Sequence, residues 1–187
     1  MSEININKQR EQDISIVMVT PGMNPESLTA LASMKEIKAM VLVTYATGTT
    51  PETLNGAIQE VTQKGIPVFL LSSNSGDPAG ILNDTNYEPQ AQSKKAGAIA
   101  LQKVNIKHIQ QVLDAIQAEI DAKKKGPELG EAIRTKYAYA PGEEKPKPDW
   151  EIPSKIAEQR TLLGHTLRRM GTPEDEIEKA LDRWEGK

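Results

Sequence analysis

The sequence contains no cysteine, which excludes disulfide bridges, thiol catalysis and cysteine-ligated metal sites. It also lacks an excess of basic residues, because 23 lysines and arginines are set against 26 aspartates and glutamates, for a net charge of -3. Surfaces that bind nucleic acids are strongly basic, so we expect no nucleic-acid partner. No stretch approaches the roughly 20 apolar residues of a membrane span. The first residues also lack a signal peptide's charged and apolar regions. We therefore expect a cytoplasmic protein without membrane contact, and incorporation into a virion or another assembly stays open.

Large apolar side chains are also scarce. Aromatic residues make up 4% of the chain and hydrophobic residues 37%, which is low for a wholly compact domain. A length of 187 residues allows one ordinary domain and an appendage. At Pro141 the composition changes to a charged, proline-rich stretch typical of a semi-extended linker. We expect a polar arm over 1–12, an α/β domain over 13–140, a linker over 141–153 and a helical hairpin over 154–187.

Short apolar runs alternate with helical patterns in the first two thirds of the chain, and this order predicts the fold class. Strands are expected at 14–19, 39–43, 66–71 and 98–101. The connections between them are too long for hairpins, which favours parallel strands joined by right-handed crossovers. We therefore expect an α/β fold in which a small parallel sheet of about four strands is flanked by helices, in a Rossmann-like or flavodoxin-like architecture.

Helices are expected after each strand. Leu28, Leu31 and Met34 have helical spacing in the first, and the second begins at Pro51 and stops at Lys64-Gly65. Further helices are expected at 87–97, from Asn105 to the triple lysine 123–125, and at 127–139. We expect Asn105 to cap the long helix and the lysines to complement the dipole at its end.

The stretch from Ala39 to Pro51 carries the strongest local signal. A buried strand is followed at once by polar and flexible residues, and Thr50 before Pro51 predicts a helix N-cap. In parallel sheets, ligands gather at the carboxyl ends of the strands. Another polar stretch, Ser72 to Asn86, follows the third strand. The residues expected to line a ligand site or the active site of a partner are Thr47, Gly48, Thr49, Ser73, Asn74 and Asp84.

We expect no catalytic residue in this chain. A threonine nucleophile needs an adjacent base and an oxyanion hole, and no histidine lies near Thr47, Thr49 or Thr50 in the sequence. We interpret these threonines as turn and capping residues. Asp77, Asp84 and Glu88 lack the regular spacing of a calcium loop, and no phosphate-binding glycine motif occurs. We therefore expect no metal and no cofactor.

The tail predicts two short amphipathic helices. Ile156, Leu163, Leu167 and Met170 mark the first, and Ile177, Leu181 and Trp184 mark the second. Two such helices bury too little apolar surface to be stable alone. We expect them to dock on the α/β domain, on a second copy or on another protein. The residues expected to make this interaction are Trp150, Leu163, Leu167, Ile177, Leu181 and Trp184.

Several short motifs occur in one order along the α/β domain. They are Thr20-Pro21-Gly22-Met23, Ile37-Lys38-Ala39-Met40-Val41-Leu42 with Tyr45 and Gly48, Gly65-Ile66-Pro67-Val68, and Tyr87 followed by Ala96-Gly97-Ala98-Ile99. In this order they resemble the C-terminal domain of bacterial and archaeal L-asparaginases and of related amidotransferase subunits. The resemblance extends from Ile14 to about Ile120 and implies the parallel sheet expected above.

The resemblance also implies what this sequence lacks. In that family the nucleophilic threonine, its helper threonine and the activating Asp and Lys lie in an N-terminal domain, which has no counterpart in residues 1–12. The family's C-terminal domain lends polar side chains to a neighbour's active site across a dimer interface. One of them is an asparagine after a glycine, and here Thr49 follows Gly48. The family's acidic contributor falls near 81–84.

Three hypotheses about function follow. The first is a non-catalytic interaction or structural module in which the tail helices dock on a partner protein or another copy. The second is the small subunit of a split L-asparaginase or amidotransferase, completed by a separately encoded N-terminal domain. The third is a small-ligand sensor that uses the strand ends as a pocket.

Overall fold

The computed structural model describes residues 13–45, 47–75, 88–140, 142–143 and 153–184, without the side chains of 88, 153–156, 158–159 and 183–184. The chain divides into two compact units, Met1–Glu144 and Lys145–Lys187. We call them the body and the tail and describe each by itself. Among the described residues, no helix combines the length and apolar character needed to cross a bilayer.

The body is built on a four-stranded parallel sheet. Its strands are β1 (Ile14–Met18), β2 (Ala39–Thr44), β3 (Val68–Ser72) and β4 (Ile99–Asn105), and they lie side by side in chain order. The α/β fold class expected from the sequence is confirmed. β2 and β3 read as continuous apolar runs because they are the central strands, and every residue in both is buried.

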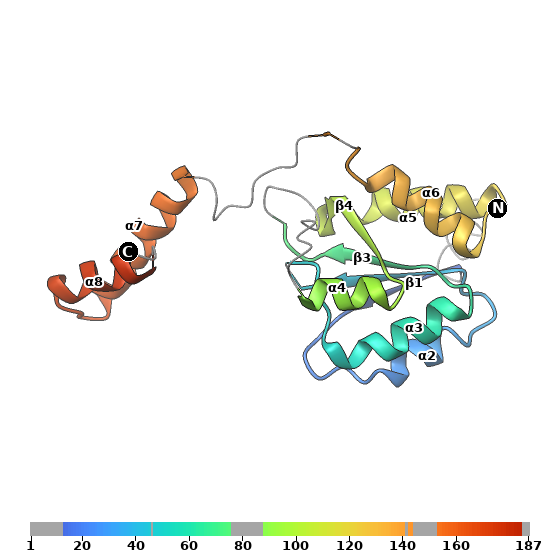
Figure 1. The fold of residues 1–187 in the computed structure, drawn as a ribbon, viewed down its shortest axis with the longest axis horizontal. Coiled ribbons are helices and arrows are strands. Elements are labelled where there is room, and N and C mark those ends of the chain that lie inside the picture. Colours follow the sequence, from blue (N-terminus) through green and yellow to red (C-terminus); the bar gives the residue numbers. More distant parts are fainter. Residues whose placement is uncertain (1–12, 46, 76–87, 141, 144–152, 185–187) are drawn as a thin grey trace, which may run out of the picture. The chain divides into compact units, whose positions relative to one another are not determined.

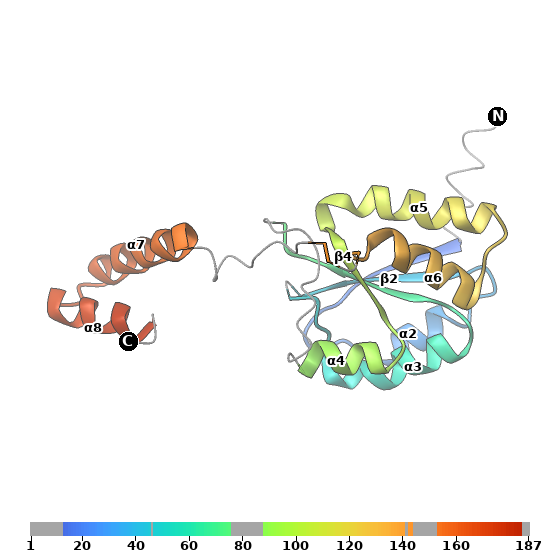
Figure 2. The same ribbon diagram turned by 45° about the horizontal axis from the view of Figure 1, so that its top comes forward.

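The body has three layers (Figures 1 and 2). One face of the sheet carries α2 (Glu26–Leu31), the short helix η1 (Glu52–Leu54), α3 (Asn55–Gln63) and α4 (Glu88–Lys95). The other face carries α5 (Ile109–Asp121), which follows the single turn η2 (Ile106–His108), and α6 (Gly126–Tyr137). Right-handed crossovers between strands that lie in chain order place all connecting helices on one face, so α5 and α6 are left to cover the other.

Alternating side chains divide the core between these two faces. In β2 and β3, Met40, Leu42 and Leu70 pack against α2 and α3, whereas Val41 and Phe69 pack against α5 and α6. One cross-strand row on the second face runs through Ile16, Val41, Phe69 and Ile99. Val41 and Phe69 are fully buried and Ile16 is 50% exposed. The layer of α5 and α6 therefore covers the centre of the sheet and Ile14 at the start of β1, and leaves β1 open from Ile16 onward.

Several element boundaries differ from those expected. α2 ends at Leu31, and Met34 lies beyond it, half-exposed. β4 continues to Asn105, well past the expected end at 101. Asn105 does cap the turn that leads into α5, since its side chain accepts a hydrogen bond from the Lys107 amide and its own amide donates to His108 Nδ1.

The triple lysine does not form the last turn of α5. α5 ends at Asp121, and Lys123, two residues later, takes a positive φ of 68°. The amides of Lys123 and Lys124 donate to Ile120 and Glu119, which is the bonding pattern of a Schellman motif. Lys124 pairs with Glu119 at 2.7 Å, and Lys125 already stands at the N-cap of α6. The three lysines therefore form the turn between two helices.

A short segment after α6 is fastened to β4. Lys103 Nζ lies 2.8 Å from Glu143 Oε2 and 5.4 Å from the centre of the Tyr139 ring. The same Glu143 oxygen accepts the Ala140 amide at 2.8 Å, and the Tyr139 amide donates to Gln102. Tyr139, Ala140 and Glu143 are therefore attached to the body.

Acid is expected to loosen this segment. Hydrogen bonds from Lys103 and from the Ala140 amide hold the pKa of Glu143 below its ordinary value. The carboxylate therefore adds stability above its unfolded pKa, and this contribution is lost as the pH falls through the lower, folded value. The chemical shift of the Ala140 amide should titrate with a midpoint below the ordinary pKa of a glutamate side chain and lose this titration in Glu143→Gln. A midpoint at or above the ordinary value would contradict the contact.

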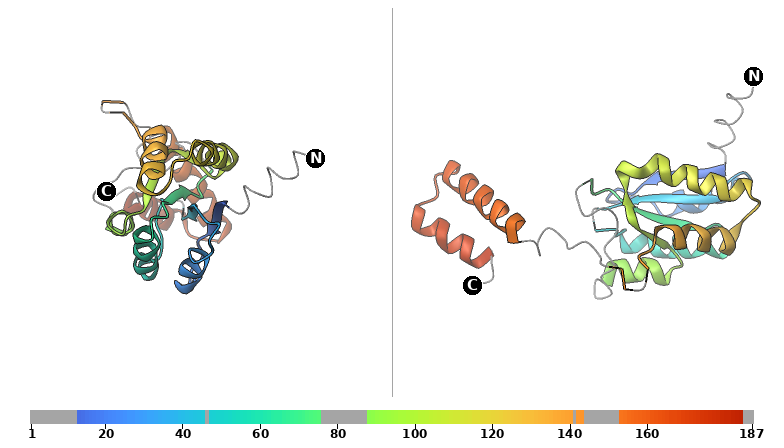
Figure 3. Two further views of the ribbon diagram at one scale, coloured as in Figure 1. Left: turned by 90° about the vertical axis from the view of Figure 1, so that its right-hand side faces the viewer. Right: turned by 90° about the horizontal axis from the view of Figure 1, so that it is seen from above.

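The tail is a helical hairpin of α7 (Pro153–Arg169) and α8 (Glu174–Trp184), two antiparallel helices (Figure 3). Ile177 and Leu181 are buried in it. Leu181 Cδ1 lies 3.6 Å from where a Cβ on Gly164 would stand, so the two helices approach closely there. Arg160 pairs with Glu178 at 3.0 Å, and Arg168 pairs with Glu174.

Candidate functional site

The carboxyl edge of the sheet near β2 is shaped by a tight turn. The Gly48 amide donates to Tyr45 O at 2.8 Å, and the Tyr45 amide donates to Thr49 O at 3.0 Å. Gly48 has a φ of 78°, a conformation that favours glycine. The turn therefore fixes Thr47 and Thr49 next to one another, with their hydroxyl oxygens 3.2 Å apart.

The two threonines differ in exposure. Thr47 is exposed, whereas Thr49 is only 6% exposed. The Thr47 carbonyl accepts a hydrogen bond from Gln90 of α4 at 3.3 Å. Thr47 is therefore the member of the pair that a molecule outside the body can reach.

Thr50 is not the N-cap predicted from the sequence. Pro51 occupies the cap position of η1, and no side chain caps that turn. The Thr50 hydroxyl instead lies 2.9 Å from Ser93 Oγ of α4, which also donates to Asn55 Oδ1 at 3.3 Å. Thr44 also makes a buried hydrogen bond, because its hydroxyl donates to Leu71 O at 3.1 Å. These buried hydroxyls join β2 to β3 and α3 to α4, so their role is structural.

The edge continues after β3 with exposed polar residues. The Ser73 amide donates to Thr44 O and thereby extends the β2–β3 pairing by one residue. The Asn74 amide donates to Ser72 Oγ at 3.1 Å. Ser73 and Asn74 are both exposed. Asp84, the acidic residue expected at this edge, lies outside the described residues, as do Asp77 and Trp150.

At the carboxyl ends of β3 and β4, the chain leaves the sheet toward opposite faces. β3 leads to α4 on one face, whereas β4 leads to α5 on the other. Such a divergence is where parallel sheets open a crevice for ligands. Here it lies between Ser72 and Asn105, which pair across β3 and β4. The expected residues Thr47, Gly48 and Thr49 lie beside β2, one strand away.

Acid, base or metal chemistry has little support at this edge. In the described parts of the chain, no three His, Asp or Glu side chains come close enough to hold a metal ion. No described interaction joins the Thr47–Thr49 pair to a titratable group. His108 is used in the cap of the turn before α5, and His165 is exposed on α7 of the tail. The described residues at this edge can offer hydrogen bonds to a partner, and among them no base contacts the Thr47 or Thr49 hydroxyl.

Sequence reasoning missed the contribution of α4. Gln90 and Ser93 are almost fully buried and hold Thr47 and Thr50 in place from 43 residues away in the chain. Their helix is short and strongly polar, EPQAQSKK, and its sequence resembles that of an exposed surface helix. No periodicity distinguishes these two positions from their neighbours.

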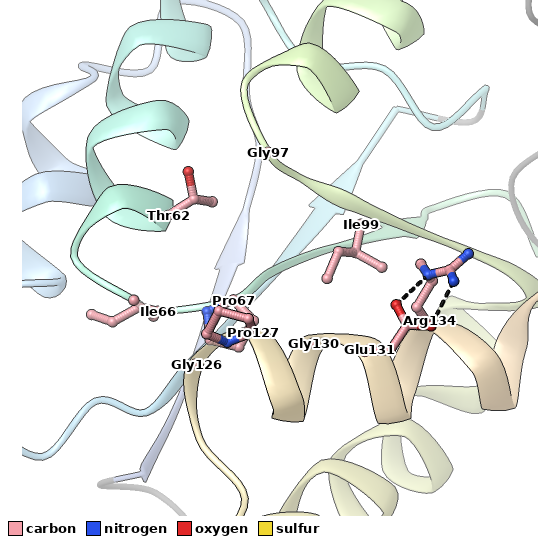
Figure 4. A pocket seen from close by; sticks show the side chains of 11 residues that line it. Thr62, Ile66, Pro67, Gly97, Ile99, Gly126, Pro127, Gly130, Glu131 and Arg134 are labelled. Atoms are coloured by element: carbon pink, nitrogen blue, oxygen red, sulfur yellow. Dashed lines mark hydrogen bonds and ion pairs between the residues drawn. The ribbon is translucent and has the colours of Figure 1, made fainter.

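A hollow of about 300 Å³ lies at the opposite, amino edge of the sheet (Figure 4). Its walls come from the end of α3, the starts of β3 and β4, and α6, and they include Ile66, Pro67, Ile99 and Gly130. Arg134 on its rim donates two hydrogen bonds to Glu131 and thereby lowers the pKa of that carboxyl. The sequence reasoning placed no site here.

The comparison with protein families shows which family the body belongs to. The model of the glutaminase/asparaginase C-terminal domain matches residues 13–121. The chain belongs to this family. The match covers the strands, the crossovers and α5, so the resemblance drawn from the sequence motifs is confirmed. No curated protein sequence matches the chain closely enough to count as a relative.

Solved structures agree on the fold. The body is similar to the thermostable L-asparaginase from Thermococcus kodakarensis, with 22% identity, a TM-score of 0.53, and coverage of 68% of this chain and 36% of that one. It is also similar to L-asparaginase I from Vibrio cholerae, with 20% identity, a TM-score of 0.55, and coverage of 72% and 38%. The chain therefore spans little more than a third of the length of these enzymes.

Proposed function

We propose that this member of the asparaginase C-terminal family is a non-catalytic interaction module. In this proposal the body is a rigid scaffold and the tail attaches it to another protein or to a second copy. The observation that carries the proposal is how the hydroxyl groups at the end of β2 and in the turn after it are hydrogen-bonded. Thr44 and Thr50 are buried in structural hydrogen bonds, and no described contact activates the Thr47–Thr49 pair.

The composition of the tail supports its proposed role in attachment to another protein or to a second copy. Its described side chains include only two large apolar ones that are buried, Ile177 and Leu181. A two-helix unit with so small a core gains little from burial against the entropy of ordering its chain. Contact with another surface would supply the missing burial.

The proposal that the body is non-catalytic is tested by measuring ammonia release from asparagine and from glutamine. We expect the purified chain alone to release none, and the double variant Thr47→Val/Thr49→Val to behave identically. Thr29→Val is the control because Thr29 lies in α2, outside the turn after β2, and its hydroxyl donates within its own helix to Glu26 O. Turnover by the chain alone that is lost in the double variant and kept in the control would overturn the proposal.

The family match favours a second candidate function, that of a subunit completing an asparaginase or amidotransferase active site. Thr47, Ser73 and Asn74 present exposed polar groups at the carboxyl edge, where this family's domain is expected to meet a catalytic neighbour. The same assay, repeated after mixing with a separately produced nucleophile domain of an L-asparaginase, distinguishes the two. Ammonia release by the mixture alone, abolished by Thr47→Val/Thr49→Val, would support the subunit.

A further inference from the structure

The two edge strands of the sheet differ in what surrounds them. β4 carries polar and charged side chains, and its pairing with β3 is shifted between Leu70 and Ser72. Gln102 and Lys103 of β4 also bind the segment that follows α6. Charges, an irregular register and a covering segment are the means by which proteins keep an edge strand from pairing with another chain. The β4 edge is therefore protected.

β1 lacks a charge, a proline and a bulge. Its five residues, ISIVM, are nearly all apolar, and its pairing with β2 runs without a shift. Among the described residues, no strand lies on the side of β1 that faces away from β2. β1 is therefore the apolar and regular type of edge strand that readily pairs with another strand.

The hydrogen bonds of β1 show which of its residues face the open edge. The Lys38 amide donates to Asp13 O at 2.8 Å, and the Val19 amide donates to Val43 O at 2.9 Å. The odd-numbered residues of β1 thus turn their backbone groups toward β2. Because this direction alternates along a strand, the even-numbered residues turn their amides and carbonyls toward the edge. They are Ile14, Ile16 and Met18. The edge therefore offers an added strand a full set of backbone hydrogen bonds.

The same residues include the apolar side chains of β1 that the helices leave uncovered. Ile16 is 50% exposed and Met18 is 64% exposed. Ile14 is only 6% exposed, because it packs in the cluster under α5 and α6. On the other face of β1, Val17 and Val19 pack in the cluster that includes α2. The uncovered part of β1 is therefore its carboxyl end, on one face of the sheet.

A second copy of β1 fits this edge in its backbone and in its side chains. In an antiparallel pair about a two-fold axis at Ile16, Met18 of each copy faces Ile14 of the other, and every outward amide and carbonyl is paired. The exposed end of each β1 then lies beside the end that α5 and α6 cover in the other copy. An unrelated peptide would satisfy the backbone groups but would bring no helical layer to Met18. We propose that two copies of the chain associate through antiparallel pairing of their β1 strands.

This inference goes beyond the proposed function, because it gives the body an interface of its own, separate from the tail. The interface is small, since each copy contributes only two exposed apolar side chains and one short strand. Interfaces of this size belong to weak and transient complexes. We therefore expect a dissociation constant in the micromolar range or above.

A pair of cysteine variants tests the register. The chain has no cysteine, so Ile16→Cys and Met18→Cys each introduce one thiol at the edge. Facing residues in the proposed pair have Cα atoms about 5.5 Å apart, within the range that a disulfide spans. The two Ile16 positions face each other, whereas the two Met18 positions lie roughly 14 Å apart along the strands. Oxidation of the full chain should therefore link Ile16→Cys several-fold faster, although Met18 is the more exposed residue. Equal rates, or faster linking of Met18→Cys, would overturn the proposal.

Ile16→Lys is the variant that should prevent pairing. It sets two like charges opposite one another at the axis, and an edge lysine is a device by which natural sheets avoid pairing. In sedimentation equilibrium, the mass of the full chain should approach that of a dimer as its concentration rises to about 0.5 mM. Ile16→Lys should stay monomeric with an unchanged far-UV circular dichroism spectrum.

Leu162→Lys is the control for the added charge, because Leu162 is an exposed apolar residue of α7 in the tail. We expect it to dimerise as the unaltered chain does. A monomer at all concentrations, or equal dimerisation of the two lysine variants, would overturn the β1 pairing. The ammonia assay judges the non-catalytic role separately.

Discussion

Phe69→Ala is expected to lower the free energy of unfolding of the body by about 3–5 kcal/mol. Phe69 is the only phenylalanine of the chain, is fully buried, and lies in β3 between Val41 and Ile99. Its ring packs in the cluster that joins the sheet to α5 and α6. Truncation loses this burial and leaves a cavity, because the neighbouring strands on both sides hold the backbone in place.

Ile16→Ala is the control for this prediction. Ile16 belongs to the same cross-strand row as Phe69 but lies on the edge strand and is 50% exposed. We expect a loss of about 1 kcal/mol or less. Urea unfolding should be followed by far-UV circular dichroism, since both tryptophans, Trp150 and Trp184, lie in the tail. Comparable losses at the two positions would mean that the helical layer also covers β1 at Ile16.

The strands and the fold class could be predicted because the central strands are buried on both faces. A parallel sheet covered by helices requires continuous apolar runs such as Val68–Leu71, and these contrast with the polar turns around them. The order of the strands within the sheet could not be predicted from these apolar runs. Each strand of the body is compatible with several neighbours, and only the pairing of backbones shows that β1 to β4 follow the chain.

The errors at element boundaries have a common physical cause, which is that local signals compete with tertiary contacts. α5 ends at Asp121, before the triple lysine 123–125 that predicted its end, because Lys123 takes the left-handed conformation and Lys124 pairs with Glu119. Thr50 has the sequence of an N-cap, yet its hydroxyl faces Ser93. Neither partner can be identified from spacing alone.

The candidate site was predictable in place and not in detail. The carboxyl ends of parallel strands are a general location for sites, and Gly48 marked the turn that positions Thr47 and Thr49. Whether a hydroxyl is available for chemistry depends on what the fold places beside it. For Thr50 that neighbour comes from α4, and for Thr44 it is the backbone of β3. These contacts give both hydroxyls a structural role, with partners that spacing in the sequence does not identify.

Gly97→Ala is expected to destabilise the body by about 2–3 kcal/mol. Gly97 ends α4 with a φ of +95°, and its amide donates to Lys94 O. A Cβ at this position would stand 2.8 Å from Thr62 Oγ1 and 3.1 Å from Thr62 Cβ. Thr62 cannot simply turn away, because its hydroxyl donates to Ala96 O at 3.0 Å and thereby fastens α3 to the end of α4. Lys123 shows that a side chain is tolerated at a positive φ elsewhere in this body, so the contact with Thr62 should add to the backbone strain at Gly97.

Gly56→Ala provides the matched substitution of opposite sign. Gly56 lies in α3 with nothing within 4 Å of the added Cβ, so alanine should stabilise the body by about 0.5–1 kcal/mol. A double-mutant cycle then separates strain from contact at Gly97. In a Thr62→Ala background, the loss caused by Gly97→Ala should shrink by at least about 0.5 kcal/mol, because the closest overlapping atom has gone. If Gly97→Ala costs as much stability in the Thr62→Ala background as in the wild type, the whole cost comes from the backbone conformation. The contact between α3 and α4 would then not require a glycine at this position.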